Sequence, residues 1–175
     1  MTTRAPTDGC RGGRLDGTVV ERCLEFRNRF HTLPYSSATL FVPCGGRPEA
    51  VNISNVASLF YPDGKPRFLY IVEGANLFFT QQARLYLESR GVIIFKDASA
   101  NKGGVTSSSL EVLAALAFTD EEFHEHMQVT DPEHPPAFYL DYVKDVQSII
   151  EENAALEFEC LWMVCAPRAR QHYLV

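Results

Sequence analysis

The chain has 175 residues, a length that fits one domain or one domain and part of a second. Hydrophobic residues make up 46% and charged residues 22%, which excludes a wholly disordered, collagen-like or coiled-coil chain. The net charge of −6 argues against nucleic-acid binding, because neutralising phosphates requires a surplus of Lys and Arg. No apolar run approaches the ~18 residues of a membrane span, so we expect a partner that is neither nucleic acid nor membrane.

The five cysteines form neither a CxxC pair nor a regular framework, and their number is odd. Reduced thiols in an intracellular protein are therefore expected, with cytoplasm and mitochondrion equally open. The cysteines are Cys10, Cys23, Cys44, Cys160 and Cys165.

Three apolar runs predict strands. They follow a glycine-rich segment, residues 1–15, that is expected to be a disordered leader. The runs are Thr39–Val42, Phe68–Val72 and Val92–Phe95. Because each run is apolar at successive positions, we expect strands buried on both faces, as in a parallel sheet.

A helix is predicted between the second and third strands, over residues 80–90. Thr80 is a good N-cap, and Gly91 is typical of the position just after a helix. The helical period places Ala83 and Leu87 on the inner face, and we include Leu85 with them.

Two capping boxes predict further helices. Ser108 precedes Glu111 by three residues, which predicts a helix over 110–118. Thr119 opens a second box and a short helix over 120–127.

A linker and one long amphipathic helix follow within residues 129–163. From Tyr139 to Leu161, apolar residues recur at steps of three and four, and the helix is predicted over 137–163. Residues 164–175 are expected to be a solvated tail.

Strands that alternate with helices predict an α/β fold with a parallel sheet and flanking helices. Ligands of such sheets bind outside the carboxyl ends of the strands, and right-handed crossovers bring the loops that follow the strands to one rim. Those loops are Pro43–Arg47, Glu73–Asn76 and Asp97–Val105. Small residues and polar side chains in each loop favour this rim as the ligand site.

Two strings carry a family resemblance: EGAN at residues 73–76 and ANKGGVTSSSLE at residues 100–111. With their neighbours over residues 16–162, they closely resemble the coenzyme domain of glutamate dehydrogenases, specifically the large NAD-specific enzymes of fungi. The resemblance implies a partial Rossmann-like, NAD-binding domain over 16–128. The departures from the general family strings, LFF at 77–79 and Lys102, point to the large NAD-specific branch.

The resemblance implies a cofactor site for NAD. Cys44, Gly45 and Gly46 would lie along the adenosine ribose side of the cofactor. Asn76 would hydrogen-bond the nicotinamide carboxamide or its ribose, and Asn101 would contact the nicotinamide ribose and the amino-acid substrate. An amide both donates and accepts, which suits a carboxamide. The residues alone leave open that both asparagines only cap or turn the chain.

The resemblance also implies part of a substrate pocket. Val105 would line the space for the substrate side chain, and Ser108 would bind the distal carboxylate of L-glutamate or 2-oxoglutarate. A helix beginning near Ser108 would favour this anion through the dipole at its N-terminus.

We expect no catalytic residue and no metal ligand in the chain. In the family the chemistry depends on lysines and an aspartate of a substrate domain that has no counterpart here, and the Gly-rich pyrophosphate loop is also missing. His124 and His126 point to different faces of their predicted helix and would not share a metal.

Three hypotheses of function follow. The chain is part of an NAD-dependent glutamate dehydrogenase, which oxidatively deaminates L-glutamate to 2-oxoglutarate and ammonium. It would be inactive alone, and its expected partners are further copies of the chain in a homo-oligomer or full-length subunits. Alternatively, it is a truncated, non-enzymatic remnant that acts only by association with such subunits. A related dehydrogenase of leucine, phenylalanine or valine also stays open.

Overall fold

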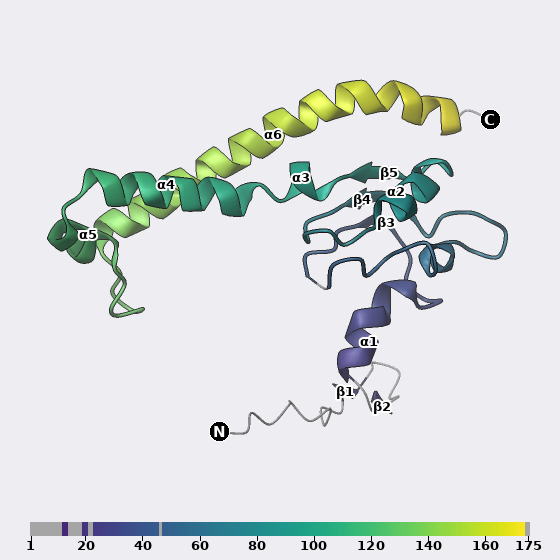
Figure 1. The fold of residues 1–175 in the computed structure, drawn as a ribbon, viewed down its shortest axis with the longest axis horizontal. Helices are drawn as coiled ribbons and strands as arrows, with labels where there is room; N and C mark the ends of the chain where they lie inside the picture. The colour runs from purple at the N-terminus through teal and green to yellow at the C-terminus, as the bar shows by residue number, and fades with distance from the viewer. Residues whose placement is uncertain (1–11, 14–18, 21–22, 46, 174–175) are drawn as a thin grey trace. The chain divides into compact units, whose positions relative to one another are not determined.

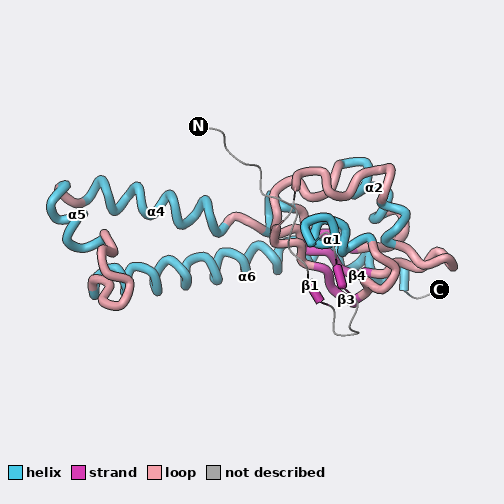
Figure 2. The backbone as a smooth tube through the Cα atoms, turned by 90° about the horizontal axis from the view of Figure 1, so that it is seen from below, coloured by secondary structure: helices cyan, strands magenta, loops and turns pink. Residues whose placement is uncertain are grey.

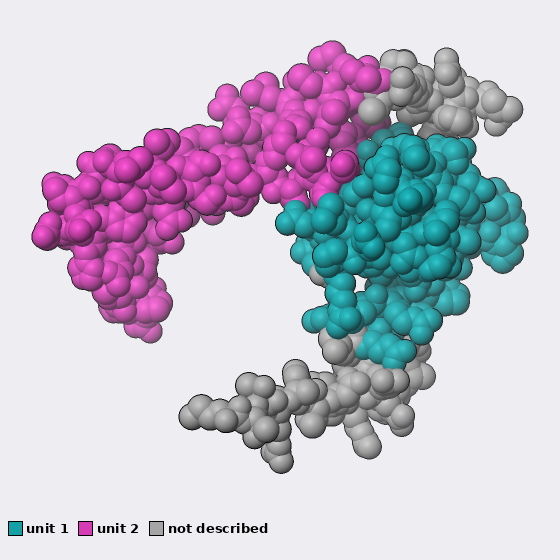
Figure 3. All heavy atoms as spheres, in the orientation of Figure 1, with its two compact units in different colours: residues 1–94 teal, residues 95–175 magenta. Residues whose placement is uncertain are grey.

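A computed structural model describes residues 12–13, 19–20, 23–45 and 47–173. The chain divides into two compact units, residues 1–94 and residues 95–175, which Figure 3 colours separately. Among the described residues, no helix combines the length and the apolar character needed to cross a membrane.

The first unit contains a small sheet and short helices (Figure 1). Its elements in chain order are β1 (Gly12–Gly13), β2 (Val19–Val20), α1 (Cys23–Arg29), the 3₁₀ helix η1 (Phe30–Thr32), β3 (Ala38–Phe41), the 3₁₀ helix η2 (Val56–Leu59), β4 (Phe68–Val72), α2 (Gln81–Glu88) and β5 (Ile93–Phe95), whose last residue belongs to the second unit. β1 and β2 pair antiparallel. β1 falls within the segment expected to be a leader, of which residues 1–11 and 14–15 lie outside the described residues.

The main sheet has the strand order β3-β4-β5, and β3 pairs parallel with β4 with Ala38 opposite Phe68 and Leu40 opposite Tyr70. This confirms the predicted α/β fold with a parallel sheet. The expectation that every strand is buried on both faces is wrong for β3, because its first three residues, Ala38–Leu40, are exposed on both faces of the strand and Leu40 is 49% exposed. β4 has the buried character that its sequence predicts.

The buried face of helix α2 agrees with the prediction at two positions and differs at one. Thr80 caps it by accepting a hydrogen bond from the Ala83 amide, and Ala83 and Leu87 are buried as predicted. Leu85 is 55% exposed, so its predicted inward position is wrong. Leu85 follows Ala83 by two residues, which corresponds to a rotation of about 200° and places it on the opposite face of the helix. The buried third position of this face is Arg84 instead.

The second unit is helical, with α3 (Asp97–Ala100), α4 (Gly103–Ala117), α5 (Asp120–Met127) and α6 (Ala137–Tyr173). Figure 2 shows α4 and α6 running side by side, with α5 at the turn that connects them. The long C-terminal helix is confirmed, and it runs beyond the predicted end at residue 163. The short helix α3 was not predicted.

The predicted start of the helix near Ser108 is wrong. α4 begins at Gly103, with Lys102 as its N-cap, and Ser108 lies inside the helix. Its hydroxyl donates to the carbonyl of Val105 at 3.1 Å. A serine can stay within a helix when its hydroxyl bonds back one turn, so the Ser-x-x-Glu spacing does not mark a start here.

The capping box of α5 is confirmed. The Thr119 hydroxyl accepts from the Glu122 amide at 3.3 Å, and the Glu122 carboxylate accepts from the Thr119 amide at 2.9 Å. The Thr119 amide, followed by the Thr119 hydroxyl, donates to the Glu122 carboxylate and holds the pKa of that carboxyl below its ordinary value.

Alanine should therefore have effects of different size at the first positions of the two Ser/Thr-x-x-Glu patterns. Thr119→Ala removes a real cap, and we expect it to lower the free energy of unfolding of the second unit by about 1 kcal/mol. Ser108→Ala, the matched control inside α4, should change it by less than about 0.5 kcal/mol. Urea unfolding followed by circular dichroism measures both, and equal losses would contradict the assignment.

Candidate functional site

The loops that follow β3 and β4 meet at the carboxyl edge of the sheet in the first unit. The amide of Ala75 donates to the carbonyl of Pro43 at 2.7 Å. A Cβ atom on Gly74 would lie 3.2 Å from both the Cys44 Sγ and the Pro43 oxygen, so the two loops approach closely only because residue 74 is glycine. The structure thus brings Cys44 and Gly45 beside the segment that carries Asn76. Gly46 lies outside the described residues.

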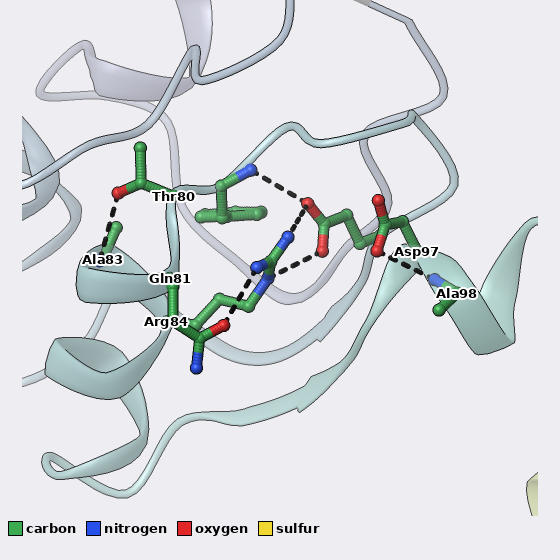
Figure 4. Close-up of polar contacts among 8 residues, drawn as sticks. Thr80, Gln81, Ala83, Arg84, Asp97 and Ala98 are labelled. Atoms are coloured by element: carbon green, nitrogen blue, oxygen red, sulfur yellow. Dashed lines mark hydrogen bonds and ion pairs between the residues drawn. The ribbon is translucent and has the colours of Figure 1, made fainter.

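Glu73, the first residue of the EGAN string, is fully buried. Its carboxylate accepts from Arg84 Nε at 3.1 Å, Arg84 Nη2 at 3.0 Å and the Phe79 amide at 2.9 Å. Figure 4 draws the hydrogen bonds of Arg84, which also donates to Gln81 Oε1 at 3.4 Å. Both carboxylate oxygens are engaged within the protein, so Glu73 holds the loop and not a ligand.

This ion pair closes the loop that contains Asn76. Glu73 stands at the end of β4, Arg84 lies on α2, and the intervening residues are fixed at both ends. A buried carboxylate needs such a set of donors, because desolvation otherwise penalises its charge heavily.

A second set of backbone contacts holds the same loop from the other side. The Glu49 amide donates to the Leu77 oxygen at 2.7 Å, and the Thr80 amide donates to the Val51 oxygen at 2.9 Å. Leu77, next to Asn76, has a φ of 53°, in the left-handed region that a leucine rarely adopts. Backbone strain of this kind persists only where the surroundings fix it, and it clusters at functional sites.

A hollow of about 460 Å³ opens beside Gly45 in the first unit. Its wall includes the side chains of Arg27, Arg47, His31, Phe41 and Phe78. No ion pair with a carboxylate is found for Arg27 or Arg47 within the described part of the chain. A hollow with two guanidinium groups and several aromatic rings suits an anionic ligand that carries a flat ring.

His31 is a buried residue at this hollow, and no pattern in the sequence singles it out. It is 7% exposed, and its ring lies 5.1 Å from the Phe78 ring and 6.1 Å from the Phe41 ring. Burial lowers the pKa of His31, a shift opposed in part by a hydrogen bond with the Ala50 backbone. Among the described residues, its Nε2 has no hydrogen-bond partner.

The remaining predicted site residues lie in the second unit. Asn101 follows α3, and its backbone N–H donates to the backbone oxygen of Asp97 at 3.0 Å. Val105 and Ser108 are one turn apart on α4 and share a face, and Val105 is 70% exposed. Because Asn76 and Asn101 belong to different units, their proximity stays a prediction. The helix dipole that was expected to favour an anion at Ser108 acts at Gly103, where α4 begins.

Histidines, cysteines and carboxylates give no metal centre in the described part of the chain, where no three of them gather. The His126 ring packs against the rings of Phe118 and Phe138, with centroid distances of 5.7 and 5.9 Å. His134 contacts Asp131 at 2.8 Å.

The fold and the site together define an α/β protein with a candidate ligand site at the carboxyl edge of a parallel sheet. A sequence model described as Glutamate/Leucine/Phenylalanine/Valine dehydrogenase matches residues 17–168. The chain belongs to this family. The resemblance to the NAD-specific glutamate dehydrogenases is confirmed by the relatives below.

Glutamate dehydrogenase 2 of Dictyostelium discoideum is 63% identical over 147 residues, which cover 84% of this chain and 14% of that protein. The probable NAD-specific glutamate dehydrogenase of Schizosaccharomyces pombe is 57% identical over 84% of this chain and 13% of its own length. The NAD-specific glutamate dehydrogenase of Neurospora crassa is 54% identical over 84% of this chain and 14% of its own length. The chain thus spans only a small part of the length of the curated relatives it matches.

The buried ion pair predicts a large loss of stability when one partner is removed. Glu73→Gln leaves the Arg84 charge buried without its counter-charge, and we expect the first unit to lose about 3–5 kcal/mol. Urea unfolding measures the loss. Glu88→Gln, an exposed change on α2, is the control and should cost less than about 0.5 kcal/mol.

A double variant distinguishes two causes of the loss of stability: the missing ion pair itself, and the cost of leaving one charge buried without a partner. Arg84→Met leaves the Glu73 carboxylate buried and unpaired, whereas Glu73→Met combined with Arg84→Met leaves no charge there. We expect the double variant to be more stable than Arg84→Met alone. A double variant that is the less stable of the two would show that lone burial is not the dominant cost.

His31 predicts a dependence of stability on pH. The pKa of His31 lies below its ordinary value of 6.5 in the folded chain. Between these two pKa values the imidazole binds a proton in the unfolded chain but not in the folded one. The free energy of unfolding therefore falls as the pH drops through 6.5, and it levels off below the lowered pKa. Urea unfolding between about pH 5 and about pH 8 measures this. We expect His31→Phe to remove the fall and His124→Gln, an exposed control, to keep it.

Proposed function

We propose that the chain supplies the nicotinamide side of an NAD site and part of the substrate pocket of an NAD-dependent glutamate dehydrogenase. The observation that carries this proposal is the joined pair of loops at Pro43–Gly45 and Glu73–Asn76, held by the Glu73–Arg84 ion pair. The relatives are named as NAD-specific glutamate dehydrogenases, which supports the choice of cofactor and of L-glutamate and 2-oxoglutarate as substrate and product.

In this proposal the first unit holds NAD along the two loops. Cys44, Gly45 and Gly46 lie along the adenosine ribose side, and Asn76 hydrogen-bonds the nicotinamide carboxamide or its ribose. An added Cβ on Gly45 would meet no other atom within 4 Å, so the loop leaves room for a ligand beside it. Bound NAD would accept the hydride from the substrate.

The second unit contributes Asn101 to the nicotinamide ribose and the substrate, and two residues of α4 to the pocket. Val105 lines the pocket for the substrate side chain. The Ser108 hydroxyl, which donates to Val105 in this structure, turns to donate to the distal carboxylate of glutamate. A hydroxyl at this place favours glutamate over the apolar amino acids that other members of the family oxidise.

The isolated chain is proposed to be inactive. General acid–base catalysis needs a positioned group with a tuned pKa, and the catalytic lysines of the family have no counterpart in this chain. Catalysis would therefore require association with full-length subunits that carry those lysines, and a homo-oligomer of this chain alone would stay inactive. Exposed apolar side chains on α4 support association: Val105, Val112, Leu113 and Leu116.

The alternative is a non-enzymatic remnant that binds no dinucleotide and acts only by association. The exposed side chains of the edge strand β3 and of α4 favour it, because such surfaces recruit another chain. Binding of NADH and the size of the particle separate the two functions.

Asn76→Ala tests the cofactor site. We expect NADH titration by fluorescence to give saturable binding to the parent chain and about tenfold weaker binding to the variant, because the carboxamide loses its hydrogen bonds. Gln82→Ala, an exposed amide on α2, is the control and should bind as the parent does. Size-exclusion chromatography is run on the same samples.

Large assemblies that do not bind NADH would favour the remnant. Turnover of glutamate and NAD by the purified chain alone would contradict the claim that it is inactive.

A further inference from the structure

The junction between α3 and α4, which presents Asn101, is held from a distant part of the sequence. Lys102, the residue after Asn101, donates to Glu157 of α6 at 2.5 Å. The Glu157 carboxylate also forms a hydrogen bond with the side chain of Ser99 on α3. The contact with Lys102, followed by that with Ser99, holds the pKa of Glu157 below its ordinary value, so the carboxylate is charged at neutral pH. One carboxylate thus grips the chain on both sides of Asn101.

A second contact from the same face of α6 completes the grip. A Cβ on Gly103 would lie 3.3 Å from the Ile150 Cγ2 atom, so the start of α4 packs tightly against Ile150. Ile150 and Glu157 are seven residues apart, which places them on one face of the helix. Residues 99, 102 and 103 are therefore all tied to two positions of α6.

We propose that Glu157 is a positioning residue, which fixes the turn at Asn101 so that the asparagine side chain meets the nicotinamide ribose and the substrate. This inference rests on the role given to Asn101 in the proposed function. Its partner Lys102 is the position at which the ANKGGV string departs from the general family form. The departure gains a physical reason here, because the lysine has a carboxylate on α6 to pair with.

The charge of Glu157 is what the role requires. The Lys102 side chain is more than half exposed and that of Glu157 is 28% exposed. Solvent therefore weakens the attraction between the two charges, and the main effect of the pair is to restrict the positions that the turn can adopt. The adjoining Gly103-Gly104 pair gives the turn wide conformational freedom unless it is restrained. Without the Glu157 carboxylate, the turn loses its contacts with α6 through Lys102 and Ser99 and keeps only the packing of Gly103 against Ile150.

The test uses the full chain and the variant Glu157→Gln. We expect faster hydrogen exchange at the amides of residues 99–104 and about fivefold weaker binding of NADH. Glu159→Gln, an exposed carboxylate on the same helix, is the matched control and should leave both unchanged. The charge-swapped pair Lys102→Glu with Glu157→Lys re-forms the ion pair and should restore most of the affinity, which a general loss of folding would not allow.

Unchanged exchange at residues 99–104 in Glu157→Gln would overturn the proposal. So would faster exchange with unchanged NADH affinity, because the residue would then support the fold and not the site. If the parent chain does not bind NADH, the proposed function fails, and the exchange measurement alone still decides whether Glu157 holds the turn.

Discussion

The ion pair between Glu73 and Arg84 is the interaction on which the first unit depends. The Glu73 side chain is fully buried and that of Arg84 is 7% exposed, and the carboxylate is stable there because it accepts three hydrogen bonds. It joins the end of β4 to α2, so the chain between them, including Asn76, has little freedom to move. The same contact that stabilises the core therefore also fixes the geometry of the candidate site.

Local signals predicted those elements whose structure is decided locally. The apolar run Phe68–Val72 is β4, and the Thr119 capping box opens α5 at the expected residue. The prediction failed where a longer element or a neighbour decided the outcome. α4 extends N-terminally through a serine run that tolerates helix, and β3 is exposed although its apolar run predicts burial.

The site was predictable only in outline. The rule for the carboxyl ends of parallel strands correctly brought the loops after β3 and β4 together. The supporting contacts came from residues far apart in sequence, such as Lys102 and Glu157, 55 residues apart, and no local pattern announces such a pair. His31 was missed for the same reason, since its burial arises from rings on other elements. The roles of Asn76 and Asn101 came from the family resemblance, and the structure adds how each is supported.

The contact between Gly74 and Cys44 has a consequence for how this site can vary. The two positions share one small volume, since the sulfur occupies the space that a side chain at residue 74 would need. A Cβ at residue 74 would also lie 3.2 Å from the backbone oxygen of Pro43, so a smaller residue at position 44 would relieve only one of the two close contacts. The backbone that follows β3 therefore restricts residue 74 to glycine, although the two segments lie 30 positions apart in the sequence.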